Sequence, residues 1–169
     1  PKDFTELCMQ AAEIMLMQGK VAENKEEARK MLDEVVASGK AFETFKDMVK
    51  AQGGNVDMIE NPELLPQSKF KTEIKSEESG NVKVLHSERL GVLAMQLGAG
   101  RETKEQDVNH AVGLELACKR GDKVNKGDTI CIVYHDEELK PQWVDELYHA
   151  FELTNEEVAP QPIIEKVLS

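Results

Sequence analysis

The segment of this chain with the clearest chemical potential is Gly98-Ala99-Gly100-Arg101, with Lys104 three residues further on. Glycines permit positive φ angles and close backbone approach, so such a loop can lie over a bound anion and offer it the Arg101 guanidinium. The segment lacks the strand-to-helix setting of a dinucleotide fingerprint and the Gly-Lys-Ser/Thr ending of a P-loop. Spacing alone leaves two interpretations open, a structural turn, which we favour, and a ligand-facing lid.

A second candidate is Gly121-Asp122-Lys123-Val124, followed by Lys126-Gly127-Asp128, between two predicted strands. Glycine and aspartate favour turns, and the lysines stay in water. Lipoyl- and biotin-carrying domains use a similar hammerhead turn, but they present an acceptor lysine on a separate exposed hairpin. The residues that follow the second strand, 134–138, contain no lysine. We therefore expect a related fold without the carrier function.

Other kinds of catalytic or metal site find little support. The four histidines lack the helical i, i+4 pairing and the clustered carboxylates of a zinc enzyme, so no metal site is expected. There is no Gly-X-Ser-X-Gly motif, so covalent hydrolysis is not expected. Adjacent acids such as Glu26-Glu27 and Glu137-Glu138 point in different directions on a helix, which favours solvated faces over acid-base catalysis.

The elements before residue 55 are predicted to be three amphipathic helices, over residues 3–19, 24–39 and 40–52. Asp3 is a candidate cap for the first, and Asn24 with Glu27 three positions on is a capping pair for the second. Each helix has one apolar and one charged face. The helices either form a small bundle or pack half of their exposed surface against further chain.

Residues 55–67 contain Asn61-Pro62 and Leu65-Pro66, which predict an extended connector. Alternating patterns beyond it predict strands, and the closing segment 151–169 adds one or two more near Phe151 and Ile163. Helices are predicted over 87–97, with Ser87 as the cap, and over 141–150. The predicted strands cover residues 70–74, 81–85, 112–117 and 129–134. The sequence therefore predicts an α+β fold.

Composition sets broad limits on function. With 169 residues, 40% hydrophobic and 31% charged, the chain has the composition of a soluble globular protein. It contains neither a membrane-spanning apolar run nor a signal peptide, so we expect a cytoplasmic protein that does not contact membranes. A net charge of -11 argues against nucleic acid as a partner, because nucleic-acid binding needs a positive field.

Cysteine content and the first residue add two expectations. Cys8, Cys118 and Cys131 have neither paired nor metal-like spacing and lie in apolar contexts, so we expect buried free thiols in a reducing compartment. The chain begins at Pro1 without an initiator methionine, from which we expect that it was taken from a longer protein.

Several of these motifs, in order, resemble the pyrimidine-nucleoside phosphorylases of the thymidine phosphorylase family. The resemblance is densest over residues 79–134 and extends over most of the chain. The matching segments are Pro1 to Leu7, Glu26 to Arg29, Phe45-Lys46, Gln52 to Gly54, Leu65-Pro66, Leu90-Gly91, Leu97 to Arg101, Lys104-Glu105, Ala111 to Gly113 and the turn from Gly121 to Gly127.

The resemblance implies a domain plan. Residues 1–54 would be the helical end of an α/β domain, 55–68 a linker, and 69–169 a C-terminal α+β domain with a hammerhead or barrel-sandwich core. It also implies that the whole enzyme is a homodimer and that this chain itself holds no cofactor. In that enzyme phosphate, the co-substrate, displaces thymine or uracil from a pyrimidine nucleoside and leaves a pentose 1-phosphate.

The family's phosphate loop and its Arg, Ser and Lys contacts to the base have no counterpart in this sequence, so no catalytic residue carries over and the missing N-terminal part is an expected partner. The family's cleft-facing loop does carry over, as Gly98, Gly100, Arg101 and Lys104. Whether thymidine or uridine is preferred stays open. The alternative function is a stand-alone biotinyl- or lipoyl-like binding or interaction module.

Overall fold

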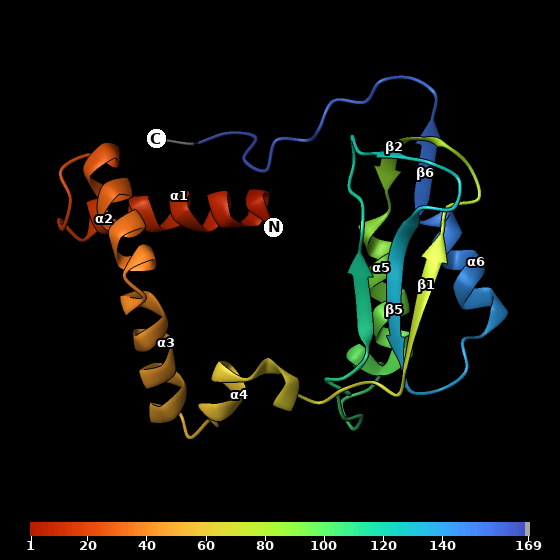
Figure 1. Cartoon of the computed structure of the whole chain (residues 1–169), viewed down its shortest axis with the longest axis horizontal. Helices are drawn as coiled ribbons and strands as arrows, with labels where there is room; N and C mark the ends of the chain where they lie inside the picture. Colours follow the sequence, from red (N-terminus) through yellow and green to blue (C-terminus); the bar gives the residue numbers. More distant parts are fainter. Residues whose placement is uncertain (168–169) are drawn as a thin grey trace. The chain divides into compact units, whose positions relative to one another are not determined.

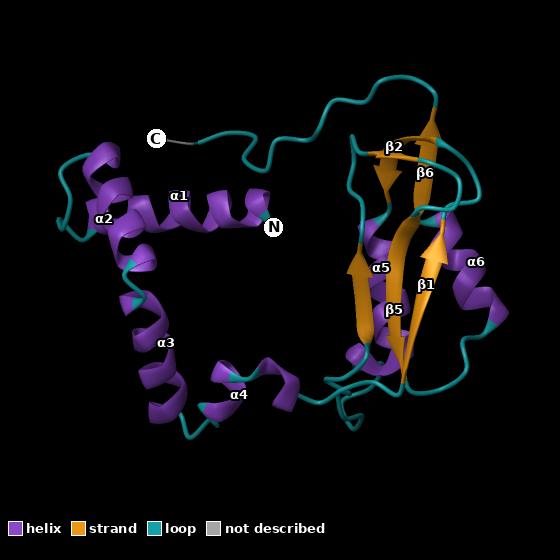
Figure 2. Cartoon of the chain, in the orientation of Figure 1, coloured by secondary structure: helices purple, strands orange, loops and turns teal. Residues whose placement is uncertain are grey.

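The computed structural model describes residues 1–167, which form two compact units (Figure 1). Unit 1 comprises residues 1–64 together with the described residues from 162 to 167, and unit 2 comprises residues 65–161. Unit 1 is helical, and all the strands of the described chain lie in unit 2 (Figure 2). The division between Leu64 and Leu65 falls inside the connector predicted at residues 55–68.

Unit 1 contains the three predicted helices, α1 (Lys2–Gln18), α2 (Lys25–Ala37) and α3 (Lys40–Ala51). The capping pair of α2 is confirmed, because the Asn24 side chain accepts a bond from the Glu27 N–H at 3.0 Å. The Glu27 carboxylate in turn accepts from the Glu23 N–H at 2.8 Å. The predicted cap at Asp3 is wrong, because α1 already begins at Lys2 and places Asp3 inside the first turn.

Arg29 on α2 joins the first two helices. Its guanidinium pairs with the carboxylates of Glu6 and Glu13, both on α1, and Glu13 is buried. The hydrogen bond from Arg29 lowers the pKa of Glu6, and the bonds to Glu6 and Glu13 raise the pKa of Arg29. This charged triad is therefore the specific contact that sets how α1 and α2 pack.

The helices of unit 1 enclose almost no apolar core. Among the described residues of this unit, the buried apolar side chains are two alanines, Ala22 and Ala28. Large apolar side chains lie on the surface instead, with Met15 70% exposed and Phe4 58% exposed. Burial of apolar surface is the main favourable term in folding, so three helices with so little of it are poorly supported on their own.

The predicted extended connector is wrong in detail. Residues 57–64 form two short helical turns, α4 (Asp57–Glu60) and the 3₁₀ turn η1 (Pro62–Leu64). The side chain of Asn55 accepts a bond from the Asp57 N–H at 2.9 Å and so supports the start of α4. Pro62 occupies the first position of its turn, where a missing N–H costs nothing. Proline therefore separates the two turns without preventing them.

Unit 2 contains two three-stranded antiparallel sheets. One has the order β1-β5-β3 and the other β4-β2-β6. Figure 1 shows β1 and β5 side by side, with Ile74 opposite Cys131. The strands are β1 (Phe70–Lys75), β2 (Gly80–Leu85), β3 (Gly113–Leu116), β4 (Lys123–Val124), β5 (Thr129–His135) and β6 (Phe151–Thr154).

The core of unit 2 is built from these sheets and two helices, α5 (Ser87–Ala94) and α6 (Pro141–His149). Its fully buried large side chains are Val82, Cys131, Val133 and Leu147. On β5 the side chains of Cys131, Val133 and His135 are buried at alternate positions, which is the period of a strand with one face inward. The predicted α+β class is confirmed, and the hammerhead or barrel-sandwich core stays a prediction.

Three local predictions in unit 2 need correction. The helix predicted over 87–97 changes at Met95 into one wider turn of π-helix, η2 (Met95–Ala99), and Ser87 is its first residue rather than its cap. Strand β4 was not predicted, because two residues are too short to show alternation. Of the closing strands, β6 is confirmed, whereas Ile163 and Ile164 form none, in a segment where Pro160 and Pro162 lack N–H donors.

Candidate functional site: the glycine loop and its cavity

The predicted lid segment lies in the loop that connects η2 to β3, and residues 98–109 are called the glycine loop below. Gly98 has a φ angle of +107°, a value that residues other than glycine rarely adopt. The N–H of Asn109 donates to the carbonyl of Gly98 at 2.8 Å and so closes the loop at its base. At Gly100 the reason for glycine is space, because a Cβ would lie 3.1 Å from the Cβ of Met95.

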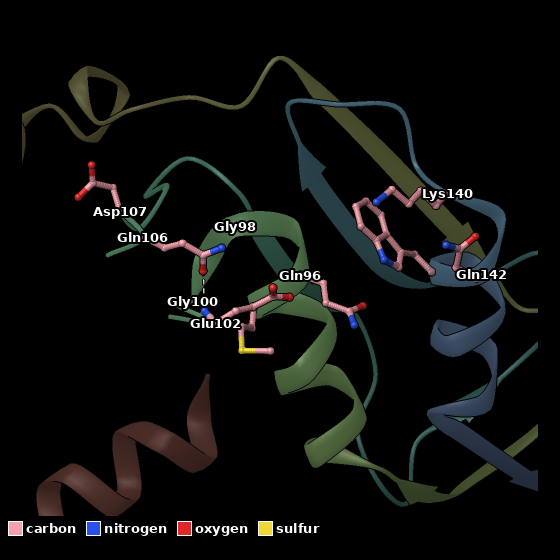
Figure 3. Close-up of a pocket in the computed structure, with 10 residues that line it drawn as sticks. Gln96, Gly98, Gly100, Glu102, Gln106, Asp107, Lys140 and Gln142 are labelled. Atoms are coloured by element: carbon pink, nitrogen blue, oxygen red, sulfur yellow. Dashed lines mark hydrogen bonds between the residues drawn. The ribbon is translucent and has the colours of Figure 1, made fainter. Parts of the chain in front are cut away.

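Gln106 organises the middle of the loop. Its Oε1 accepts bonds from the N–H of Glu102 at 2.7 Å and the N–H of Thr103 at 3.3 Å. Figure 3 marks the contact between Gln106 and Glu102. Two neighbouring backbone donors are thus occupied by a neutral side-chain oxygen from the same loop, which holds residues 102–106 as one folded turn.

An open cavity of about 520 Å³ lies beside this loop. Glu102 and Asp107 line it from the loop and Lys140 from the start of α6, together with Gln96 and Gln142. In Figure 3 the Asp107 carboxylate points away from the other side chains drawn. The lining is Met95, Gln96, Gly98, Gly100, Glu102, Gln106, Asp107, Lys140, Gln142 and Trp143. With two carboxylates and one ammonium, it offers hydrogen bonds to a polar group but no positive field for a free anion.

The four predicted site residues divide into two pairs. Gly98 and Gly100 line the cavity, whereas Arg101 and Lys104 are exposed on the loop and do not line it. The role of Gly98, Gly100, Arg101 and Lys104 toward a ligand stays a prediction.

Sequence reasoning missed the α6 side of the cavity, which consists of Lys140, Gln142 and Trp143. The Lys140 ammonium lies 4.5 Å from the centre of the Trp143 ring, a cation-π distance. The one available signal was that Trp143 is the single tryptophan of the chain.

A second open cavity, of about 640 Å³, continues from the first between α5 and α6. The two cavities share Gln96, Gln142 and Trp143. Arg89 on α5 and Glu146 on α6 form an ion pair at 2.7 Å in the second one. This pair links the two helices at the surface, where both side chains are about half exposed. Because the two opposite charges are paired, neither adds a net charge to the cavity.

The second sequence motif forms two matching turns. In residues 119–122 the N–H of Asp122 donates to the Lys119 carbonyl at 3.0 Å, and in residues 125–128 the N–H of Asp128 donates to the Asn125 carbonyl at 3.0 Å. Each aspartate side chain accepts the N–H of the first residue of its turn at 2.8 Å. Both aspartates and Lys126 of this motif thus belong to type II-like turns with glycine at the third position, whereas Lys123 lies in β4.

The histidines are distributed over separate partners. His86 contacts Glu152 at 2.7 Å, and His135 contacts the Thr72 hydroxyl at 2.8 Å. Across residues 1–167, no group of three or more His, Cys, Asp or Glu side chains is arranged to hold a metal ion. None of the helices in that range is long and apolar enough to cross a membrane.

The cysteines do not offer a reactive thiol in the core. Cys118 and Cys131 are buried as predicted, and burial raises the pKa of Cys118 to about 11 and that of Cys131 to about 12. Such thiols stay protonated at neutral pH, and the thiolate is the reactive form. Cys8 was predicted to be buried and is exposed, because α1 lacks a covering layer on that side.

Comparison with known proteins identifies the domain that contains the glycine loop. Residues 81–154, which include η2, the glycine loop and the paired turns, match the model of the pyrimidine nucleoside phosphorylase C-terminal domain. These residues form a pyrimidine nucleoside phosphorylase C-terminal domain. The helices of unit 1 lie outside the matched domain but inside the similarity to whole relatives.

Two relatives show the extent of this similarity. A pyrimidine-nucleoside phosphorylase of Bacillus subtilis (strain 168) is 37% identical over 163 residues, which are 96% of this chain and 38% of the relative. One of Staphylococcus aureus (strain USA300) is 39% identical over 169 residues, 100% of this chain and 39% of the relative. The chain thus spans about two fifths of the length of these relatives. A stand-alone biotinyl- or lipoyl-like module is not favoured.

Gly98→Ala is expected to destabilise unit 2 by about 1 to 2 kcal/mol, the usual cost of a side chain in a left-handed conformation. Space is not the cause, because the nearest atoms to a Cβ there lie 3.5 Å and 3.6 Å away, at ordinary contact distance. The measurement is urea unfolding followed by the fluorescence of Trp143, which reports on unit 2 alone.

The matched control for Gly98→Ala is Gly91→Ala, within α5, where a Cβ meets nothing within 4 Å. Alanine is about 1 kcal/mol better than glycine inside a helix, so the control should stabilise unit 2. Equal stability changes in both variants would contradict the strained geometry at Gly98.

Proposed function

We propose that this chain serves as scaffold and lid in a pyrimidine-nucleoside phosphorylase whose phosphate- and nucleoside-binding groups come from another part of the enzyme. In the proposed reaction, phosphate displaces thymine or uracil from the anomeric carbon of the nucleoside and forms a pentose 1-phosphate. The observation that carries the proposal is the match of residues 81–154 to the model of the C-terminal domain, beside a cavity that has no cluster of anion-binding groups among its lining residues.

The lining of the cavity explains why the chemistry needs more than this chain. Phosphorolysis requires donors that hold a phosphate and an environment that stabilises a cation-like sugar in the transition state. Lys140 is the single cation in the lining, and the carboxylates of Glu102 and Asp107 oppose a bound anion. In the proposed arrangement the glycine loop faces the substrate cleft of the whole enzyme, and exposed Arg101 and Lys104 supply positive charge at its rim.

Unit 1 supports the same proposal from a different direction. Its helices bury two alanines as their apolar core and expose Phe42, Phe45 and Met48 along one side of α3. Side chains of that size at helical spacing are normally covered. We therefore propose that these helices complete an α/β domain with the remainder of the enzyme, which acts in the cytoplasm as a homodimer, and that this chain itself holds no cofactor.

The purified 169-residue chain is expected to show no phosphorolysis of thymidine or uridine. Release of the free base in the presence of inorganic phosphate is followed by absorbance, with the Bacillus subtilis relative as the positive control and a reaction without protein as the blank. Base release above the blank at any chain concentration would contradict the proposal, because it would place the phosphate-binding donors within these residues.

A further inference from the structure

Asp136, in the segment between β5 and α6, lies between two parts of unit 2 that are far apart in the sequence. Its Oδ1 accepts the backbone N–H of Lys69 at 2.8 Å, at the point where the chain enters β1. Its Oδ2 accepts the Nδ2 amide of Asn109 at 2.7 Å, at the base of the glycine loop. One carboxylate therefore joins the residue before β1 to the end of the loop.

Asn109 continues this connection into the loop itself. Its backbone N–H donates to the Gly98 carbonyl at 2.8 Å, and its Oδ1 accepts the N–H of Ala111 at 3.0 Å. The Asn109 side-chain oxygen is thus occupied, which fixes the amide with its NH₂ toward Asp136. Asn109 therefore makes the bonds to Gly98, to Ala111 and to Asp136. The residue that holds the two ends of the glycine loop together is the one whose side chain Asp136 orients.

We propose that Asp136 is a positioning residue, which holds the base of the glycine loop in place by linking Asn109 to the main chain at Lys69. The inference rests on the proposed function only in giving the loop a substrate-facing role. The loop's ordering itself follows from the hydrogen bonds. A shift of the main chain at Lys69 would be transmitted through the carboxylate to Asn109, so the loop is sensitive to how the chain enters β1.

The chemistry of the position favours a carboxylate. Both neighbours of Asp136 are donors, so the group between them has to accept two bonds at once. These two donors, the Lys69 N–H first, lower the pKa of Asp136, which keeps it ionised at neutral pH. An asparagine in its place would turn its NH₂ group toward a donor. Asn109 cannot compensate by rotating its amide, because its Oδ1 would then no longer accept the N–H of Ala111.

The test is amide hydrogen exchange of the full chain and of Asp136→Asn at neutral pH. The variant loses one of two charge-assisted bonds, so the exchange of the Asn109 and Ala111 amides is expected to accelerate about tenfold. The amides of Cys131 and Val133 in β5 are the internal reference and should not change. A variant that merely weakened unit 2 as a whole would accelerate the β5 amides by the same factor.

Four further variants make the result decisive. Asn109→Ala should accelerate the Ala111 amide at least as much as Asp136→Asn does, because it removes the Oδ1 that accepts this N–H. Asn109→Ala combined with Asp136→Asn should add little to Asn109→Ala alone, because Asp136 acts on the loop through Asn109. Lys69→Ala should change nothing, because the donor at Lys69 is the backbone, and Glu138→Gln controls for the loss of one nearby exposed charge.

Selective acceleration at the loop base supports the proposal. Unchanged exchange at Asn109 and Ala111, equal acceleration in β5, or additive effects in the double variant would overturn it. None of these readouts uses phosphorolysis. Base release by the chain would therefore contradict the proposed function but not the role of Asp136. Unchanged amide exchange in Asp136→Asn would contradict the role of Asp136 but not the proposed function.

Discussion

Replacing Leu147 with alanine is expected to lower the free energy of unfolding of unit 2 by about 3 kcal/mol, within the range for buried leucines. Leu147 is 1% exposed on α6 and belongs to the core that the two sheets and two helices share. The change removes apolar contacts and leaves a space that rigid neighbours such as Val82 and Val133 fill only in part. Urea unfolding followed by Trp143 fluorescence measures the effect.

The control for Leu147→Ala is Val92→Ala on α5, where the side chain is 46% exposed. That variant removes apolar atoms from water-facing surface and should change stability by no more than about 0.5 kcal/mol. A loss below about 1 kcal/mol for Leu147→Ala would contradict the packing of α6 against the core. Because Trp143 lies in unit 2, unfolding of unit 1 does not enter the signal.

Most of the fold follows from local sequence patterns. The helices of unit 1 and strands β1, β2 and β5 were predictable because each contains enough residues to show its period. Some errors concern local details, such as the start of α1 and the helical turns at 57–64, whereas the missed strand depends on a long-range contact. Strand β4 forms because Lys123 and Val124 pair with Asn81 and Gly80 of β2. The types of these two residues do not predict that pairing.

The candidate site was predictable on the loop side only. Gly98 and Gly100 were predictable as special positions because glycine permits positive φ angles and close backbone contacts. The structure requires glycine at Gly98 for its positive φ angle and at Gly100 for lack of space. Trp143 and Gln142 arrive from α6, more than thirty residues further along the chain, through the packing of α6 beside α5. Their position in the cavity depends on tertiary packing, so it could not be predicted from sequence spacing.

The paired turns offer a way to separate two costs of replacing a glycine. Gly121 and Gly127 have nearly the same conformation, with φ angles of +94° and +93°. Each also donates its N–H to a carbonyl elsewhere in unit 2, Val82 at 2.9 Å and Ser76 at 2.8 Å. The surroundings differ, because a Cβ at Gly127 meets nothing within 4 Å, whereas one at Gly121 meets backbone atoms of Pro160 at 3.0 Å.

Gly121→Ala is expected to destabilise unit 2 by about 3 kcal/mol, of which the backbone strain accounts for about 1 to 2 kcal/mol and crowding for the remainder. The crowded atoms belong to the main chain of Val158 and Pro160, which cannot give way by changing a rotamer. The segment after β6 must therefore move away from the turn. Urea unfolding followed by Trp143 fluorescence gives the stability.

Gly127→Ala completes this comparison, because it carries the same strain without the contact and should cost about 1 to 2 kcal/mol. The difference between the two variants then measures the close approach of the C-terminal segment to the turn at Gly121, since conformation and hydrogen bonding are matched. Equal costs for both substitutions would show that residues 158–160 do not pack against this turn in solution, and the loss at Gly121 would then be strain alone.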